Sequence, residues 1–294
     1  MTALGSPIIV EDTAMNMVSL SARAASSSTV FLPAWELVPL PVDPPSPLVE
    51  DDIRHCEDLL RNMCSREFVL NRLGELSQAP LPEIWGRLKH RLSDYIQSPG
   101  VSIKDAVDQE DREAAIYRQW LATVPSRLEF RDIQKLNSLS GAGGKLREGS
   151  TYLVSQDMSV AIPMVNWAAA RERLTEVPGL IETGALGRGL LAAIRVLALV
   201  VNAHAFTDGN GRLGRFLFNF CLHRSGLPPR AYVPLKVVAA LCSGGFEIRL
   251  REVSVFNRWD GFLEYHCLLV RLVCELATEG HQVDGSMREQ TDVQ

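Results

Sequence analysis

The run of residues 190–201 constrains the fold more than any other part of this chain. It reads Leu-Leu-Ala-Ala-Ile-Arg-Val-Leu-Ala-Leu-Val-Val and is apolar nearly all round. A helix with this composition must be covered on every side, so the run predicts a central buried helix. It is too short to span a bilayer and contains Arg195, which argues against a membrane segment.

A dense polar segment follows the apolar run directly. Residues 204–215 read His-Ala-Phe-Thr-Asp-Gly-Asn-Gly-Arg-Leu-Gly-Arg. A histidine can accept a proton near neutral pH, which makes His204 the candidate base. An aspartate supplies a hard oxygen ligand of the kind that Mg²⁺ takes together with substrate phosphates, which makes Asp208 the candidate metal ligand.

Two glycines bracket Asn210 in this segment. Gly209 and Gly211 let the backbone adopt positive φ and approach a ligand, so that successive N–H groups can form a nest for an anion. A helix that starts near Arg212 would add its N-terminal amides, with Arg212 and Arg215 on one face. Singly, such features are typical of turns, core histidines and solvated helix faces; together they predict a nucleotide site.

The segment resembles the signature of the Fic family, His-x-Phe-x-(Asp/Glu)-Gly-Asn-Gly-(Arg/Lys)-x-x-Arg, at every specified position. The resemblance implies a mainly α fold, with a Fic-type helical core and a small β-hairpin flap. It also implies an enzyme that moves AMP from Mg²⁺-bound ATP to a Ser, Thr or Tyr hydroxyl of a target protein. Ala205 departs from the family, which often has proline there, but this position carries no catalytic atom.

The family's roles carry over onto the matching residues. His204 would deprotonate the target hydroxyl, Asp208 would hold Mg²⁺, and Phe206 would anchor the loop in the core. Phosphate binding is implied for Gly209, Asn210, Gly211, Arg212 and Arg215. Arg212 would hold the β- and γ-phosphates, and Arg215 would approach the γ-phosphate. The catalytic set that the resemblance implies is His204, Asn210, Arg212 and Arg215.

Alternatives to AMP transfer stay open. Related branches of the family transfer phosphate or phosphocholine through altered loops, whereas this loop keeps both glycines. The sequence also leaves UTP and GTP open, and therefore UMP or GMP transfer. A non-catalytic Fic-fold interaction module is the alternative from another class. The Walker-type loop of P-loop enzymes is absent from the sequence.

The residues around the motif predict a flap and further core helices. Residues 145–163 follow a Gly-rich run and predict two short strands around residues 155–157, similar to the family's flap. An exposed strand edge there would align the target protein by main-chain hydrogen bonds. Helical spacing predicts a helix over 212–225. An apolar stripe over 259–269 is similar to the Trp-x-x-Phe helix that closes many Fic cores. His266 lies on this stripe and is interpreted as a core or surface residue, not as a catalytic one.

Composition divides the chain into four parts. Residues 1–48, rich in Ser, Ala and Pro, are expected to be a flexible leader. Helical spacing predicts an N-terminal helical extension over 49–125, the Fic catalytic core is placed at 126–280, and the polar residues 281–294 are expected to be a disordered tail. Such leaders also occur on bacterial effectors injected into host cells, which is the alternative to a cytoplasmic protein.

Charge and cysteine content bound the partners and the compartment. A formal net charge of −5 gives no basic footprint for nucleic acid, and no membrane partner is expected. The six cysteines lack Cys-x-x-Cys zinc spacing, so reduced thiols in a cytoplasmic compartment are the simplest account. No secretory apolar region is present in the sequence.

Regulation stays ambiguous at the level of sequence. In many Fic proteins the glutamate of a helical motif, (Ser/Thr)-x-x-x-Glu-(Gly/Asn), pairs with the last motif arginine and inhibits the enzyme. The chain has no full match: Ser243-x-x-x-Glu247, for example, is followed by Ile248. We therefore expect either a constitutively active toxin or effector, or one restrained by a separate antitoxin-like inhibitory protein.

Overall fold

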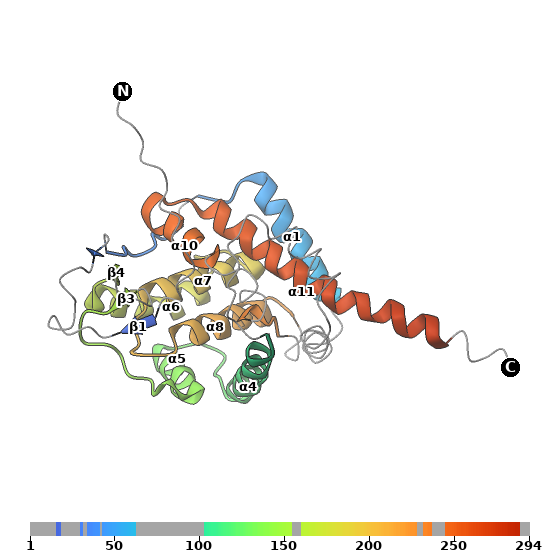
Figure 1. Cartoon of the computed structure of the whole chain (residues 1–294), viewed down its shortest axis with the longest axis horizontal. Coiled ribbons are helices and arrows are strands. Elements are labelled where there is room, and N and C mark those ends of the chain that lie inside the picture. The colour runs from blue at the N-terminus through green and yellow to red at the C-terminus, as the bar shows by residue number, and fades with distance from the viewer. Residues whose placement is uncertain are drawn as a thin grey trace, which may run out of the picture.

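The computed structural model describes residues 16–18, 30–31, 34–41, 43–62, 103–154, 160–227, 232–236 and 245–288. These residues are mostly helical, with one small sheet, as predicted (Figure 1). The helices are α1 (Pro47–Asn62), α4 (Ile103–Leu121), α5 (Phe130–Asn137), α6 (Trp167–Thr183), α7 (Gly189–Ala203), α8 (Asn210–Arg224), α10 (Gly245–Phe256) and α11 (Trp259–Arg288). The strands are β1 (Asn16–Val18), β2 (Val30–Phe31), β3 (Tyr152–Val154) and β4 (Val160–Pro163).

The predicted central helix is α7, and nearly all of its residues are buried. The one charged residue of the apolar run, Arg195, is 5% exposed. Its guanidinium donates to the Leu186 carbonyl at 3.2 Å and lies 5.8 Å from the centre of the Trp259 ring. The charge is therefore accommodated by a carbonyl and an aromatic face rather than by solvent.

The helix predicted after the polar segment is α8, which packs along α7 more extensively than any other described pair of helices pack together. Gly214 permits this approach, because a Cβ there would lie 2.8 Å from side-chain atoms of both Leu197 and Val201. The polar segment is thus the link between two closely packed, buried helices. Its geometry is fixed from both sides.

Other helices surround this pair (Figure 1). The stripe predicted at 259–269 lies on α11, which packs against α1 although the two are distant in sequence. His266 on α11 is 1% exposed and lies 2.8 Å through Nδ1 from the Phe262 carbonyl oxygen, so it is a core residue. The helix continues through Arg288, into the segment predicted as a tail.

The predicted flap hairpin is confirmed, because β3 and β4 pair antiparallel. The sheet order is β1-β3-β4-β2, so the two outer strands come from the predicted leader. Farther along that segment Trp35 and Val38 are buried, and the Trp35 amide donates to the Pro163 carbonyl at 2.8 Å. Residues 155–159, at the predicted turn, and the helical patterns predicted beyond Asn62 as far as residue 96 lie outside the described residues.

Two further sequence expectations concern thiols and membranes. The cysteines that the structure describes are free and buried, namely Cys56, Cys221, Cys267 and Cys274. Among the described residues, no helix combines the length and the apolarity needed to cross a bilayer.

Candidate functional site

His204 ends the central helix in a left-handed turn. It follows α7 with φ 49° and ψ 48°, and its amide donates to the Val200 carbonyl at 3.3 Å. A non-glycine residue adopts this conformation at a cost, so neighbouring contacts must hold it. The strained turn directs the chain away from the helix axis and opens the polar loop.

Arg147 supplies much of that support. Its guanidinium is almost completely buried and donates to the carbonyl oxygens of His204 at 2.6 Å, of Ala203 at 3.3 Å and of Gly149 at 3.2 Å. It also donates to the Val165 carbonyl. One side chain thus joins the end of α7, the base of the flap and the approach to α6. These carbonyls include one of those left unpaired at a helix C-terminus.

The loop is paired through its backbone with the residues that lead into the flap. The Arg147 amide donates to the Ala205 carbonyl and the Thr207 amide to the Lys145 carbonyl, each at 2.9 Å. Phe206, between them, is 1% exposed, as expected for a core anchor. The flap and the loop therefore form one continuous backbone unit.

Asn210 fixes the loop from within. Its side-chain oxygen accepts from the Phe206 amide and its side-chain nitrogen donates to the Phe206 carbonyl, both at 2.9 Å. Because both polar atoms of this buried amide are used on the backbone, Asn210 shapes the loop. Its side chain is committed to that role.

Gly209 precedes α8 with φ 79°, as its predicted role requires. A Cβ there would lie 2.5 Å from the Ala142 Cβ and 2.8 Å from the Asn137 side-chain nitrogen. That nitrogen donates to the Asp208 carbonyl at 3.0 Å, and the Asn137 oxygen accepts from Gly144 at 3.0 Å. Asn137, on α5, is a buried supporting residue that the sequence analysis did not single out.

Asp208 presents an exposed carboxylate beside the start of α8. Among the described residues it pairs with Arg212, at 2.7 Å, and Arg212 also donates to the Ser140 carbonyl at 2.7 Å. Within the described part of the chain, no three His, Cys, Asp or Glu side chains gather into a metal cage. A single accessible carboxylate fits Mg²⁺ that takes its other ligands from phosphates and water.

Arg215 is held by a glutamate from α4. Its Nη2 lies 2.6 Å from Glu113 Oε2 and 2.8 Å from Oε1, and its Nε lies 3.1 Å from Oε2. The Glu113 side chain is 3% exposed and the Arg215 side chain 15%. The Gln109 amide donates to Glu113 Oε1 at 2.8 Å and supports the pair from one turn earlier on α4. A two-oxygen contact of this kind is among the strongest that an arginine makes.

Sequence reasoning missed Glu113 and Arg147. Glu113 does have a glutamine four residues before it, but the sought motif has Ser or Thr there, and Ala114 follows where Gly or Asn was sought. A motif search that accepts any amide or hydroxyl at the first position and alanine at the last would have found it. Arg147 lies three residues after the end of the glycine run, yet nothing in its spacing links it to a residue so far along the chain.

The imidazole of His204 has a low proton affinity in this setting. Burial, followed by the positive charge of Arg147, lowers its pKa to about 4. The ring is therefore neutral at physiological pH, as a proton acceptor must be.

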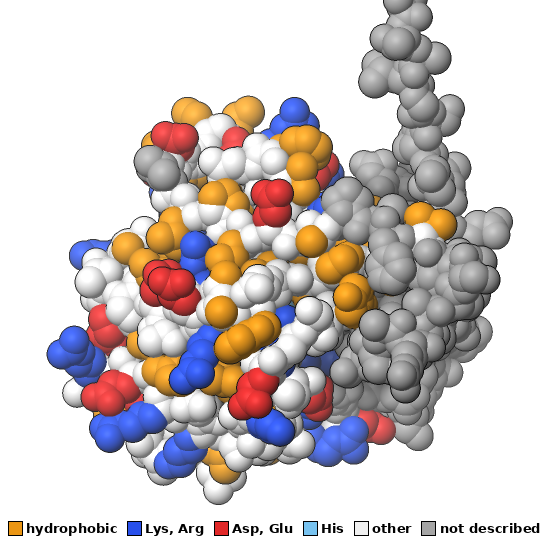
Figure 2. Space-filling model, turned by 90° about the vertical axis from the view of Figure 1, so that its left-hand side faces the viewer, with side chains coloured by type: hydrophobic (Ala, Val, Ile, Leu, Met, Phe, Trp, Pro, Cys, Tyr) orange, Lys and Arg blue, Asp and Glu red, His pale blue; other side chains and the backbone are white. Residues whose placement is uncertain are grey.

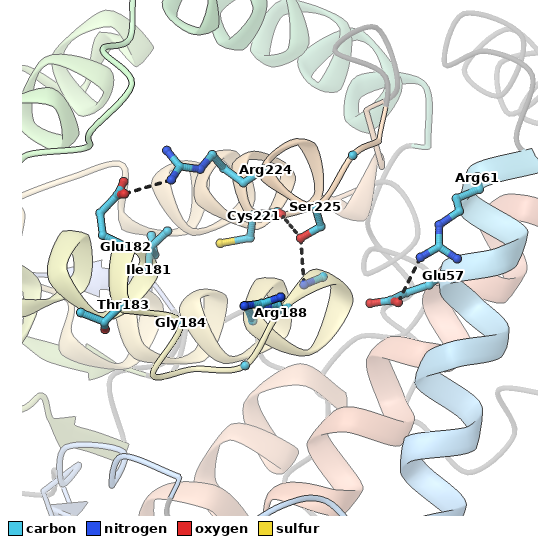
Figure 3. A pocket seen from close by; sticks show the side chains of 14 residues that line it. Glu57, Arg61, Ile181, Glu182, Thr183, Gly184, Arg188, Cys221, Arg224 and Ser225 are labelled. Carbon is cyan, nitrogen blue, oxygen red and sulfur yellow. Dashed lines mark hydrogen bonds and ion pairs between the residues drawn. The ribbon is translucent and has the colours of Figure 1, made fainter.

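A cavity of about 780 Å³ lies elsewhere, at the far ends of α7 and α8 (Figure 3). Arg188 and Gly189 line it from the start of α7, and Arg224 lines it from the end of α8. Each of these helices has 15 residues, so the cavity and the polar loop are about 20 Å apart. Arg224 is paired with Glu182 at 2.9 Å across this cavity.

Comparisons with known proteins agree with this architecture. Residues 114–222 match the model of the Fic/DOC family. A Fic family protein from Desulfovibrio desulfuricans G20 aligns at 17% identity with a TM-score of 0.51, over 83% of this chain and 77% of that chain. No curated protein matches this chain.

Two further solved structures align less closely. Fic-1 from C. elegans aligns at 19% identity with a TM-score of 0.48, over 83% of this chain and 74% of that chain. IbpAFic2, solved in complex with adenylylated Cdc42, aligns at 17% identity with a TM-score of 0.41, over 82% of this chain and 73% of that chain. At such identities the Desulfovibrio protein shows a shared fold alone. The matched residues, which include the polar loop and the flap, form a Fic/DOC domain.

Proposed function

We propose that the chain is a protein adenylyltransferase, which moves AMP from Mg²⁺-bound ATP to a Ser, Thr or Tyr hydroxyl of a target protein. The observation that carries the proposal is the polar loop, in which every residue of the family signature is present and held by named contacts. The match of residues 114–222 to the Fic/DOC family supports a transferase of this class.

His204 fits the role of general base. Because its pKa is lowered, the imidazole is neutral before the reaction and can take a proton. In the reaction, the target oxygen bonds to the α-phosphorus while the bond from that phosphorus to the pyrophosphate oxygen breaks. The hydroxyl proton passes to His204, and pyrophosphate leaves.

The start of α8 fits the phosphate groups. Gly209, Gly211 and Arg212 lie at the positive end of this helix, where backbone amides favour an anion. Asp208 would hold Mg²⁺, which when bound neutralises phosphate charge. Asn210 keeps the loop in shape through Phe206 and so positions these groups.

Arg215 is assigned to the γ-phosphate in this proposal, yet Glu113 occupies its guanidinium. We infer that the described conformation is a restrained one, in which a glutamate of the same chain takes the place of the terminal phosphate. A separate inhibitory protein stays a prediction, and the contact described here makes restraint possible without one.

The test is transfer from α-labelled ATP with Mg²⁺ to proteins of a cell lysate and to the chain itself. The natural chain and Glu113→Gln are compared, each with and without His204→Ala. We expect label that depends on His204, with intact-protein mass spectrometry showing the mass of AMP. Label that survives His204→Ala would remove this residue from the base role, and a different added mass would identify transfer of another group.

A further inference from the structure

Among the described residues, both edges of the flap are paired with other strands. Its two strands lie in the middle of the sheet, with β1 antiparallel on β3 and β2 parallel on β4. A polypeptide strand joins a sheet through the unpaired N–H and C=O groups of an edge strand. Both edges of this hairpin are already used by residues of the same chain.

We propose that β1 is a removable cover of the flap, and that an extended segment of the target protein binds along β3 after β1 has left. This inference rests on the proposed function for the identity of its partner. The two edges differ in how they are held, and the difference decides which one opens.

The edge at β4 is fixed to the core. Beyond β2, the Trp35 amide donates to the Pro163 carbonyl at 2.8 Å. The Val38 amide donates to the Asn202 side-chain oxygen at 2.8 Å, and the Val38 carbonyl accepts from Arg173 at 2.7 Å. Trp35 and Val38 are both buried. Removing β2 would therefore break the packing against α7.

The strand that covers the β3 edge has fewer contacts than the segment that covers the β4 edge. In the described residues, β1 is three residues long and is placed by its pairing with β3, with Asn16 opposite Val154 and Val18 opposite Tyr152. A strand this short contributes few main-chain hydrogen bonds, each of which is replaced by water when it separates. A partner strand that makes the same bonds can take its place.

The β3 edge also leads to the reacting groups. Residues 145–147, just before β3, are paired with the loop that carries His204, through the Leu146 and Phe206 bridge. A strand bound along β3 therefore runs beside the segment that borders the base. An edge at β4 offers no such path, because the chain beyond it continues into α6.

The charge on this side of the molecule does not favour a charged partner. On the face toward the sheet end, hydrophobic, acidic and basic side chains are interspersed over the part that is described (Figure 2). Such a surface provides little electrostatic steering. Recognition through main-chain hydrogen bonds, with little demand on target sequence, fits it better.

Hydrogen exchange tests the cover without any nucleotide. We compare the full chain with two deletions, one lacking residues 1–15, which keeps β1, and one lacking residues 1–29, which removes β1 and keeps β2. We expect paired amides of residues 152–154 to exchange at least tenfold faster only in the second. Those of 160–163 should stay unchanged. Equal exchange in all three proteins would overturn the proposal.

A tether tests the displacement. Met17 and Leu153 lie opposite each other, so M17C with L153C can join β1 to β3 when oxidised. In chains that all carry Glu113→Gln, label transfer from α-labelled ATP to lysate proteins should rise at least tenfold on removing residues 1–29. It should fall in the oxidised tether and return on reduction, with M17C alone as control. Transfer that the tether leaves unchanged overturns the proposal; no transfer from any variant refutes the proposed enzyme, while exchange still decides the cover.

Discussion

Replacing Glu113 with glutamine should free Arg215 for a nucleotide. The amide keeps the size of the side chain and an acceptor for Arg215 and Gln109, but it removes the negative charge from a buried pair. Hydrogen bonds to charged groups are worth about 1.5–3 kcal/mol, against about 1 kcal/mol for neutral ones. Over the two closest contacts, of 2.6 Å and 2.8 Å, the substitution weakens the hold on Arg215 by about 1–4 kcal/mol.

If ATP must break this pair to reach Arg215, its affinity should rise by about the same free energy, which is about fivefold to several hundredfold. Isothermal titration calorimetry with Mg²⁺-ATP measures the gain. AMP, which lacks a γ-phosphate, should bind both proteins equally. Glu182→Gln is the matched control, because it weakens the Arg224 pair at the other end of α8. An ATP affinity that Glu113→Gln leaves unchanged, or an equal gain for AMP, would refute the assignment of this pair as a restraint.

Three other predictions follow from the site and the core. Gly209→Ala should lower the free energy of unfolding by about 1–3 kcal/mol in thermal denaturation, since φ is 79° and the new Cβ meets Ala142; an unchanged melting temperature would contradict this. Burial lowers the pKa of His266 to about 4, so the unfolded chain takes this proton first and stability should fall as pH drops from about 6.5 to about 4, by about 1.4 kcal/mol per unit. His266→Gln should remove this part of the slope in urea titrations and leave the part due to His204, whose pKa is also lowered to about 4; a slope equal to that of the natural chain would count against it. Arg147→Lys should reduce kcat at least a hundredfold with ATP affinity retained, because a lysine cannot reach all four carbonyls; lost ATP binding with unchanged kcat would argue otherwise.

The sequence predicts the centre of this protein well. A run of twelve residues that is apolar except for Arg195 favours a buried helix, and α7 is one. Fixed spacing placed the loop residues together, and alternation found the β3–β4 hairpin. These elements are specified by residues close to one another in the chain, which is why periodicity and motif spacing reach them.

The contacts that the sequence did not predict join distant segments. Glu113 meets Arg215 only because α4 packs beside α8, and Arg147 meets His204 only because the flap base pairs with the loop. β1 and β2, with three and two residues, are too short to show any alternation. Composition indicated a leader there, whereas pairing with the hairpin depends on partners far along the chain.

The position of the outer strands has a consequence for biosynthesis. β2 leaves the ribosome about 130 residues before β4, its partner, and α1, α4 and α5 are made in between. Closing so large a loop is slow relative to pairing neighbours, so β2 should join the sheet after the β3–β4 hairpin has formed. A newly made chain would then pass through a stage in which the hairpin edge is still bare.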